Sequence, residues 1–93
     1  MLSEIPKDLA KVSKEDLDKE ILRLGIIAEL DAINLYEQMA SMTDDKLIKD
    51  VLMDIAGEEK THVGEFQALL LMKDEEQVKE LEDGKEEVEE MME

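Results

Sequence analysis

The single histidine of this chain, His62, lies three residues after a glutamate in the run Glu58-Glu59-Lys60-Thr61-His62. On an α-helix, positions three apart share a face, so the carboxylate of Glu59 and the imidazole of His62 would point the same way. Such a pair can bind a metal ion, and two Glu-x-x-His pairs help to build the di-iron sites of ferritin-like bundles. Because the chain is rich in glutamate, this spacing is weak by itself, and a lone helical histidine is more often an ordinary hydrogen-bonded residue.

Glu29 is a third candidate ligand, because it interrupts an apolar pattern in the same way. Ile26 and Ile33 flank Glu29, and apolar residues likewise flank the Glu59–His62 pair. Burying a carboxylate or an imidazole in such a stripe is costly unless a partner satisfies it. In a hairpin whose turn is centred near Asp44, residue 29 would lie opposite residue 59. Glu29 is therefore the glutamate of the preceding segment that has both apolar neighbours and the correct height.

Two long helices joined by a short connection must position these side chains. Ser13 is a suitable N-cap, and apolar residues then recur every three or four positions up to about Met42. The polar run 43–45 breaks this pattern, and a second apolar stripe continues from about Asp44 to Met72. So short a connection makes the two helices antiparallel neighbours. The residues expected to face inward on the second helix are Leu47, Val51, Ile55, Ala56, Val63, Phe66, Leu69 and Leu70.

The predicted fold is all-α, with an antiparallel two-helix hairpin over residues 13–72 as its ferritin-like unit. An irregular N-terminal segment over residues 1–12 precedes the hairpin. A short acidic C-terminal helix or tail over residues 73–93 follows it, with a sparse apolar line and Gly84 in its middle. We expect this last segment to dock on another surface and then to fray.

Composition excludes several classes of function. The 93 residues are enough for one small domain, and the absence of cysteine excludes disulfides and thiolate metal sites. A net charge of −16 argues against nucleic acid as a partner, because the phosphate backbone would repel this surface. The chain has no signal-like N-terminus and no apolar run long enough to span a bilayer, so we expect a cytosolic protein without membrane contact.

Counting ligands predicts self-association. A carboxylate-bridged di-iron site takes a glutamate from each of two helices and a Glu-x-x-His from each of two others. Glu29, Glu59 and His62 are half of that set. A two-fold symmetric homodimer would complete a ferritin-like four-helix bundle, whereas a monomer would offer only three ligands, as in an open zinc site. Ligands without sulfur suit iron, manganese or zinc, of which zinc has no redox chemistry.

The two predicted helices resemble the encapsulated ferritins, half-size members of the ferritin and rubrerythrin group. The resemblance covers residues 21–71, including IIAELDAINLYEQMA and EEKTHVGEF. It implies a ferroxidase that oxidises Fe(II) with dioxygen at one di-iron centre per dimer, with Glu29, Glu59 and His62 as ligands. Calcium, manganese or zinc are the alternative metals, at this centre or at secondary sites. It also implies a ring, usually a decamer, enclosed by an encapsulin shell in the cytoplasm.

Around these ligands, the chain agrees with the family pattern at some positions and departs from it at others. Asp31 and Tyr36 occupy positions that relatives use for secondary metal sites along the dimer axis. Ala28 stands where some relatives have another glutamate, and Leu35 stands where some have tryptophan. Family members often end in a shell-docking peptide or continue into the shell protein. The acidic end over residues 89–93 shows neither, so either the chain is a piece of a shell fusion or cargo loading works differently.

Two other functions are compatible with the sequence. A rubrerythrin-like peroxidase could use the same site, although rubrerythrins commonly carry a cysteine-rich domain that this chain lacks. A non-catalytic acidic helical oligomer is the second alternative. In that case Glu59 and His62 would form an ordinary buried hydrogen bond.

Overall fold

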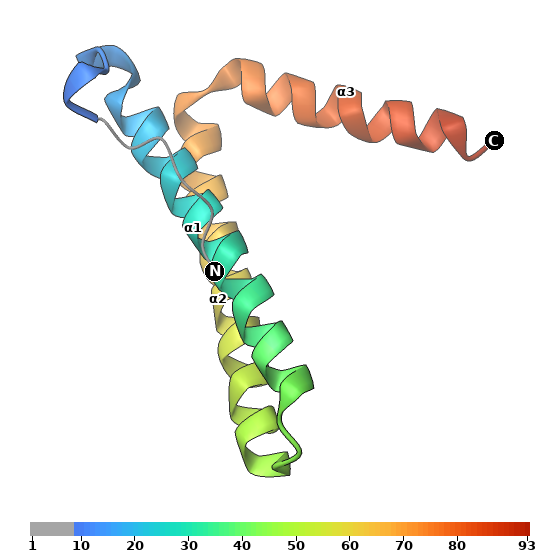
Figure 1. The fold of residues 1–93 in the computed structure, drawn as a ribbon. Helices are drawn as coiled ribbons and strands as arrows, with labels where there is room; N and C mark the ends of the chain where they lie inside the picture. Colours follow the sequence, from blue (N-terminus) through green and yellow to red (C-terminus); the bar gives the residue numbers. More distant parts are fainter. Residues whose placement is uncertain (1–8) are drawn as a thin grey trace.

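The computed structural model describes residues 9–93, and these residues form helices without any strand (Figure 1). A short 3-10 helix, η1 (Leu9–Lys11), precedes α1 (Lys14–Met42), α2 (Lys46–Lys73) and α3 (Glu75–Met91). Helices α1 and α2 run antiparallel and side by side, whereas α3 leaves the end of α2 and extends away from the hairpin. The predicted all-α hairpin with a third helix is confirmed.

The start of the chain is only partly described. Residues 1–8 of the segment predicted to be irregular lie outside the described residues, and η1 occupies its end. Ser13 is the N-cap of α1, as predicted, but its hydroxyl does not accept a backbone N–H. Instead, the hydroxyl donates to the carboxylate of Asp16 at 3.1 Å.

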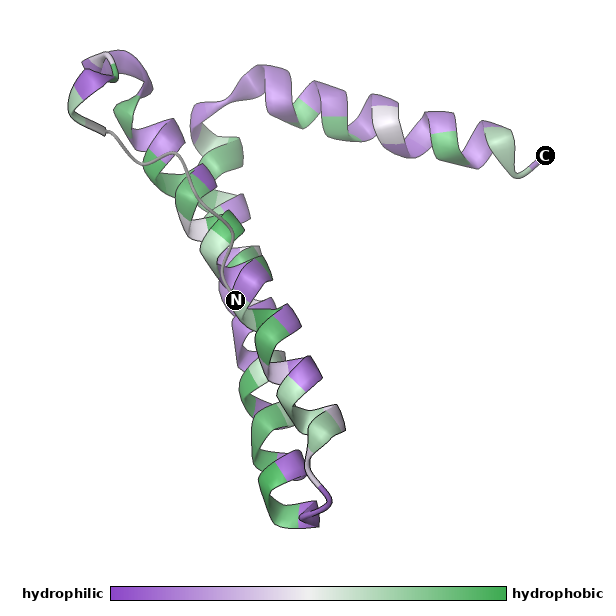
Figure 2. Cartoon of the chain, viewed as in Figure 1, coloured by the Kyte–Doolittle hydropathy of each residue, from purple (hydrophilic) through white to green (hydrophobic). Residues whose placement is uncertain are grey.

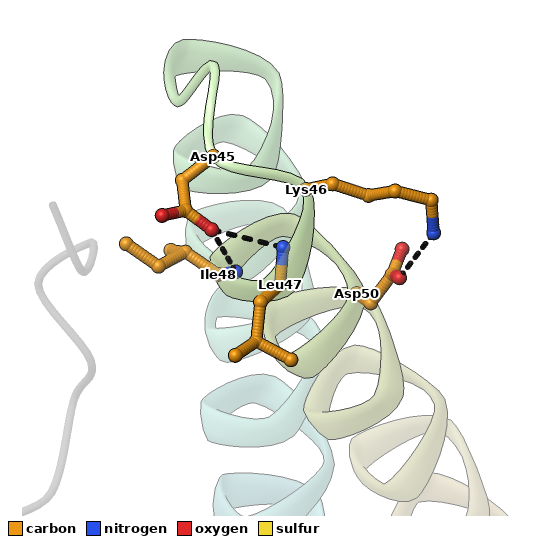
Figure 3. Close-up of polar contacts among 5 residues, drawn as sticks. All are labelled: Asp45, Lys46, Leu47, Ile48 and Asp50. Atoms are coloured by element: carbon orange, nitrogen blue, oxygen red, sulfur yellow. Dashed lines mark hydrogen bonds and ion pairs between the residues drawn. The ribbon is translucent and has the colours of Figure 1, made fainter.

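The connection between α1 and α2 is a tight turn over residues 43–45 (Figure 3). Asp45 caps α2, because its side chain accepts the backbone N–H groups of Leu47 at 2.9 Å and Ile48 at 3.1 Å. The backbone N–H of Asp45 itself donates to the hydroxyl of Thr43. These bonds satisfy groups that a helix start leaves without intrahelical partners. They therefore fix where α2 begins relative to α1.

Removing this cap should weaken the hairpin measurably. We expect Asp45→Ala to lower the free energy of unfolding by about 1 kcal/mol, the usual cost of losing an N-cap side chain. Urea denaturation followed by circular dichroism measures this loss. Asp44→Ala is the matched control, because Asp44 is the adjacent exposed aspartate and does not cap α2. Equal losses in both variants would contradict a specific capping role.

The core between α1 and α2 is thin. The buried apolar residues are Leu22, Ile33, Ala40, Ala56 and Leu70. Leu47, Val51 and Leu69, which the apolar pattern placed inward, are instead 72%, 50% and 48% exposed. A single hairpin offers each helix only one packing neighbour, so an apolar stripe wider than that contact stays uncovered. Figure 2 shows hydrophobic residues along both hairpin helices, whereas α3 is mostly hydrophilic.

Helix α3 is regular but barely packed. It continues through Gly84 to Met91 without a break, so the expected fraying is not seen before that residue, and none of its residues is buried. Asp74 is the single residue between α2 and α3. Within residues 9–93, no helix combines the length and the apolar character needed to cross a membrane.

Candidate metal centre

The structure brings the three predicted ligands together near the middle of the hairpin. Glu29 projects from α1, and Glu59 and His62 project from α2, one turn apart. The Nδ1 atom of His62 lies 3.3 Å from Oε2 of Glu29 and 3.6 Å from Oε2 of Glu59. One ligand atom from each of the three residues lies within 4.8 Å of the others. This spacing is short enough for all three atoms to reach one metal ion.

The helix register accounts for this convergence. The turn at residues 43–45 makes positions at equal distance from it face each other, and residues 29 and 59 satisfy that condition. An ion pair between Lys60 on α2 and Glu37 on α1, with Nζ 3.0 Å from Oε2, links the two helices on an exposed side. A surface pair of this kind adds little stability, and it does not join positions at equal distance from the turn.

The two carboxylates of this group are less exposed to solvent than the histidine. The side chains of Glu29 and Glu59 are each 19% exposed, whereas that of His62 is 44% exposed. Two partly shielded carboxylates that converge on one point repel each other, and a cation between them removes this repulsion. Nδ1 of His62 is the ring nitrogen that lies close to both carboxylates.

The donor atoms of this group suit the kind of metal that a ferritin-like site binds. It contains two carboxylates and one imidazole nitrogen, with no sulfur, which suits iron, manganese or zinc. Among residues 9–93, this is the one group of three or more His, Asp or Glu side chains whose ligand atoms converge in this way. In residue type and number, the three residues match half of the six-residue set of a ferritin-like di-iron site.

An open hollow of about 390 Å³ adjoins two of the three residues, Glu29 and His62. Its lining residues are Glu29, His62, Glu65, Phe66 and Leu69. The sequence did not single out Glu65 as a site residue, although it lies three residues after His62 and therefore on the same helical face. Phe66 was recognised there only as an inward-facing residue.

The two secondary candidates are not part of this group. Asp31 and Tyr36 are both half-buried on α1, and neither contributes to the convergent set. Asp31 follows Glu29 by two residues, which turns its side chain by about 200° around the helix axis. A role for Asp31 and Tyr36 in a secondary metal site stays a prediction.

The family model for rubrerythrin matches residues 20–93 of the chain. The fold and the convergent carboxylates and histidine thus belong to a ferritin-like helical protein. Since the match covers most of the sequence, the chain belongs to the rubrerythrin family.

Individual relatives narrow this assignment. The chain is 63% identical over 79 residues to a "Ferritin-like-encapsulin shell fusion protein" of Pyrococcus furiosus, covering 85% of the chain and 23% of that relative. It is 40% identical over 67 residues to the "Encapsulin nanocompartment cargo protein EncC" of Myxococcus xanthus, covering 72% of the chain and 51% of that protein. The chain therefore spans about a quarter and about half the length of these two curated relatives.

A solved structure gives the same assignment. The crystal structure of the encapsulated ferritin domain from Pyrococcus furiosus superposes with a TM-score of 0.83 at 55% sequence identity. The match covers 97% of this chain and 94% of that domain. The resemblance to the encapsulated ferritins is therefore confirmed, together with the ferritin-like fold.

Proposed function

We propose that this chain is a ferroxidase domain that oxidises Fe(II) to Fe(III) with dioxygen. The observation that carries the proposal is the convergence of Glu29, Glu59 and His62 within 4.8 Å at the middle of the hairpin. Membership of the rubrerythrin family supports a di-iron oxidoreductase. The chain's own role is to hold its substrate, Fe(II), between carboxylates that neutralise charge, while His62 supplies a nitrogen ligand.

The proposal includes a symmetric dimer, because one hairpin holds only half of a di-iron site. In a two-fold arrangement each copy would contribute the same three residues, and the carboxylates could bind and bridge two iron ions. Ile27, Leu30 and Leu69 are 40%, 49% and 48% exposed on the hairpin, which leaves apolar area for a second copy to bury. Tyr36 would hydrogen-bond a ligand or solvent beside the centre.

The wider setting of the reaction is also part of the proposal. The relatives from Pyrococcus furiosus and Myxococcus xanthus, an encapsulin shell fusion and an encapsulin cargo protein, support an encapsulin shell as the partner, inside which Fe(III) would be mineralised. Assembly of the dimers into a decameric ring within a cytoplasmic nanocompartment belongs to the same proposal. The net charge of −16 favours the approach of cations such as Fe(II).

Aerobic addition of Fe(II) to the purified chain tests the function and the dimer together. We expect a rise in ferric absorbance whose rate per chain falls when the protein is diluted below the dissociation constant of the dimer. Size-exclusion chromatography at matched concentrations gives the assembly state. A monomer that oxidises iron at the full rate would rule out a shared centre. A metal-free oligomer whose melting temperature ignores Fe(II) would favour the non-catalytic alternative.

The match to the rubrerythrin model favours one second function, a di-iron peroxidase that uses the same residues. The two reactions differ in the electron acceptor, so the assay is repeated anaerobically with hydrogen peroxide. Faster Fe(II) oxidation with peroxide than with dioxygen would assign the peroxidase reaction. Faster oxidation with dioxygen would assign the ferroxidase reaction.

A further inference from the structure

Phe66 borders the metal-ligand group on one side. It lies on α2 four residues after His62, and it lines the same hollow as His62 and Glu29. Helical side chains lean toward the N-terminus of their helix, which is the side of Phe66 on which His62 lies. Phe66 is also the only phenylalanine of the chain.

Gly25 on α1 makes room for this ring. A Cβ atom at position 25 would lie 3.1 Å from Cε2 and 3.2 Å from Cδ2 and Cζ of Phe66, closer than ordinary van der Waals contact. The other described glycines, Gly57, Gly64 and Gly84, have nothing within 4 Å of such an atom. Glycine inside a helix is unfavourable relative to alanine. At position 25, the close approach of an aromatic ring gives a reason for it.

The imidazole of His62 needs such a neighbour to hold its orientation. A metal-binding histidine usually has its second ring nitrogen fixed by a carboxylate or a carbonyl group. Within the described part of the chain, both polar contacts of His62 run through Nδ1, to Glu29 and Glu59. The side chain is 44% exposed, and Phe66 is the aromatic neighbour in the same hollow that can restrain its other edge by packing.

We propose that Phe66, seated against Gly25, is a positioning residue that holds the imidazole of His62 toward the two carboxylates. The inference rests on the proposed metal-binding function of these three residues. Phe66 restricts rotation of the imidazole from the side of the shared hollow. Gly25 acts through Phe66, because it provides the space in which the ring lies.

Co(II) binding to the full chain tests this role without relying on iron oxidation. Titration gives the affinity, and the visible d–d absorption of Co(II) reports the geometry of its ligands. We expect Phe66→Ala to weaken Co(II) binding by about tenfold, as loss of a supporting residue around a metal ligand typically does. The d–d spectrum should also change in shape. Phe66→Leu should restore most of both properties, because leucine refills much of the apolar volume.

Two glycine variants test the role of Phe66 without removing its ring. Gly25→Ala should displace the ring and alter the d–d spectrum, although the alanine itself favours the helix. Gly64→Ala is the matched control: it adds the same methyl group to a helix where nothing lies within 4 Å, and it should leave the spectrum unchanged. Circular dichroism confirms that each variant is folded.

His62→Ala separates failure of this inference from failure of the proposed function. If the wild-type chain binds Co(II) no better than His62→Ala, the proposed metal site itself is wrong. Suppose instead that His62→Ala loses binding while Phe66→Ala and Gly25→Ala keep the wild-type affinity and spectrum. The ferroxidase proposal then stands, and the positioning role of Phe66 is overturned.

Discussion

The His62→Ala variant should lose the ferric absorbance rise that the wild-type chain produces when Fe(II) is added in air. In the proposed dimer, one substitution removes both nitrogen ligands of the shared centre, because each copy contributes the same histidine. Loss of a residue that merely supports a ligand commonly costs about 10- to 100-fold in affinity or activity, so loss of the ligand itself should cost more. Stopped-flow absorbance at equal chain concentration measures the effect.

A carboxylate pair provides the matched comparison for this experiment. Glu59→Gln removes a charge from the convergent group and should also slow iron oxidation strongly. Glu58→Gln removes the same charge one residue earlier, where the side chain is exposed and outside the group, and should leave the rate near that of wild type. Wild-type rates in His62→Ala and Glu59→Gln would show that iron is oxidised elsewhere.

Metal-induced stabilisation gives a second measurement on the same variants. A metal that binds only the folded state raises the melting temperature, and the shift grows with the concentration of free metal. Added Zn(II), which does not undergo redox chemistry, should therefore raise the melting temperature of the wild-type chain and of Glu58→Gln. The shift should disappear in His62→Ala.

Acidification should release α3 from the hairpin. Asp74 joins α2 to α3, and its Oδ1 accepts the backbone N–H of Gln77 at 3.0 Å, while its Oδ2 accepts a hydrogen bond from Arg23 of α1 at 2.9 Å. The backbone hydrogen bond from Gln77 lowers the pKa of Asp74 below 3.8, with further lowering by Arg23 and by the nearby charge of Lys19, while burial opposes the shift. These bonds anchor α3, which otherwise buries no residue.

The direction of the pH effect follows from that lowered pKa. A carboxylate whose pKa is lower in the folded than in the unfolded state stabilises the fold fully above the unfolded value. Its contribution is lost as the pH falls through the folded value. The anchoring by Asp74 should therefore be constant near neutral pH and be lost as the pH falls through this lowered pKa. Faster hydrogen exchange in the first turns of α3 measures the loss.

Substitutions at neutral pH test the anchoring by Asp74 without general acid denaturation of the chain. Asp74→Asn keeps an N-cap side chain for Gln77 but removes the charge, and Arg23→Gln removes the partner from the other side. Both should speed hydrogen exchange in α3 while leaving the centre of the hairpin protected. Lys46→Gln breaks the exposed pair with Asp50 (Figure 3) and should have little effect. Unchanged hydrogen exchange in Asp74→Asn and Arg23→Gln would contradict the anchoring role of Asp74.

Much of the hairpin could be predicted because its determinants are local. Apolar residues at helical spacing mark α1 and α2, and the polar run at 43–45 can form only a short turn. A short antiparallel connection fixes which positions face each other, so the opposition of residue 29 to residue 59 follows by counting. The structure places Glu29, Glu59 and His62 together for that reason.

Other features depend on contacts that spacing does not specify. The pattern placed Leu47, Val51 and Leu69 inward, but only the width of the contact between two helices decides how much of an apolar stripe one hairpin covers. The expected fraying of the last segment was based on its sparse apolar line and on Gly84, whereas α3 continues through that residue. A single glycine lowers the stability of a helix without necessarily interrupting it.

The sequence by itself thus determined the helices, their antiparallel register and the height of the three candidate ligands, because these depend on helical period and turn length. Only the tertiary structure decided that Asp74 anchors α3 through Arg23 and that the ring of Phe66 occupies the space above Gly25. Both features depend on how side chains far apart in the sequence approach each other. Such approaches are set by packing between helices, which the pattern along one helix does not contain.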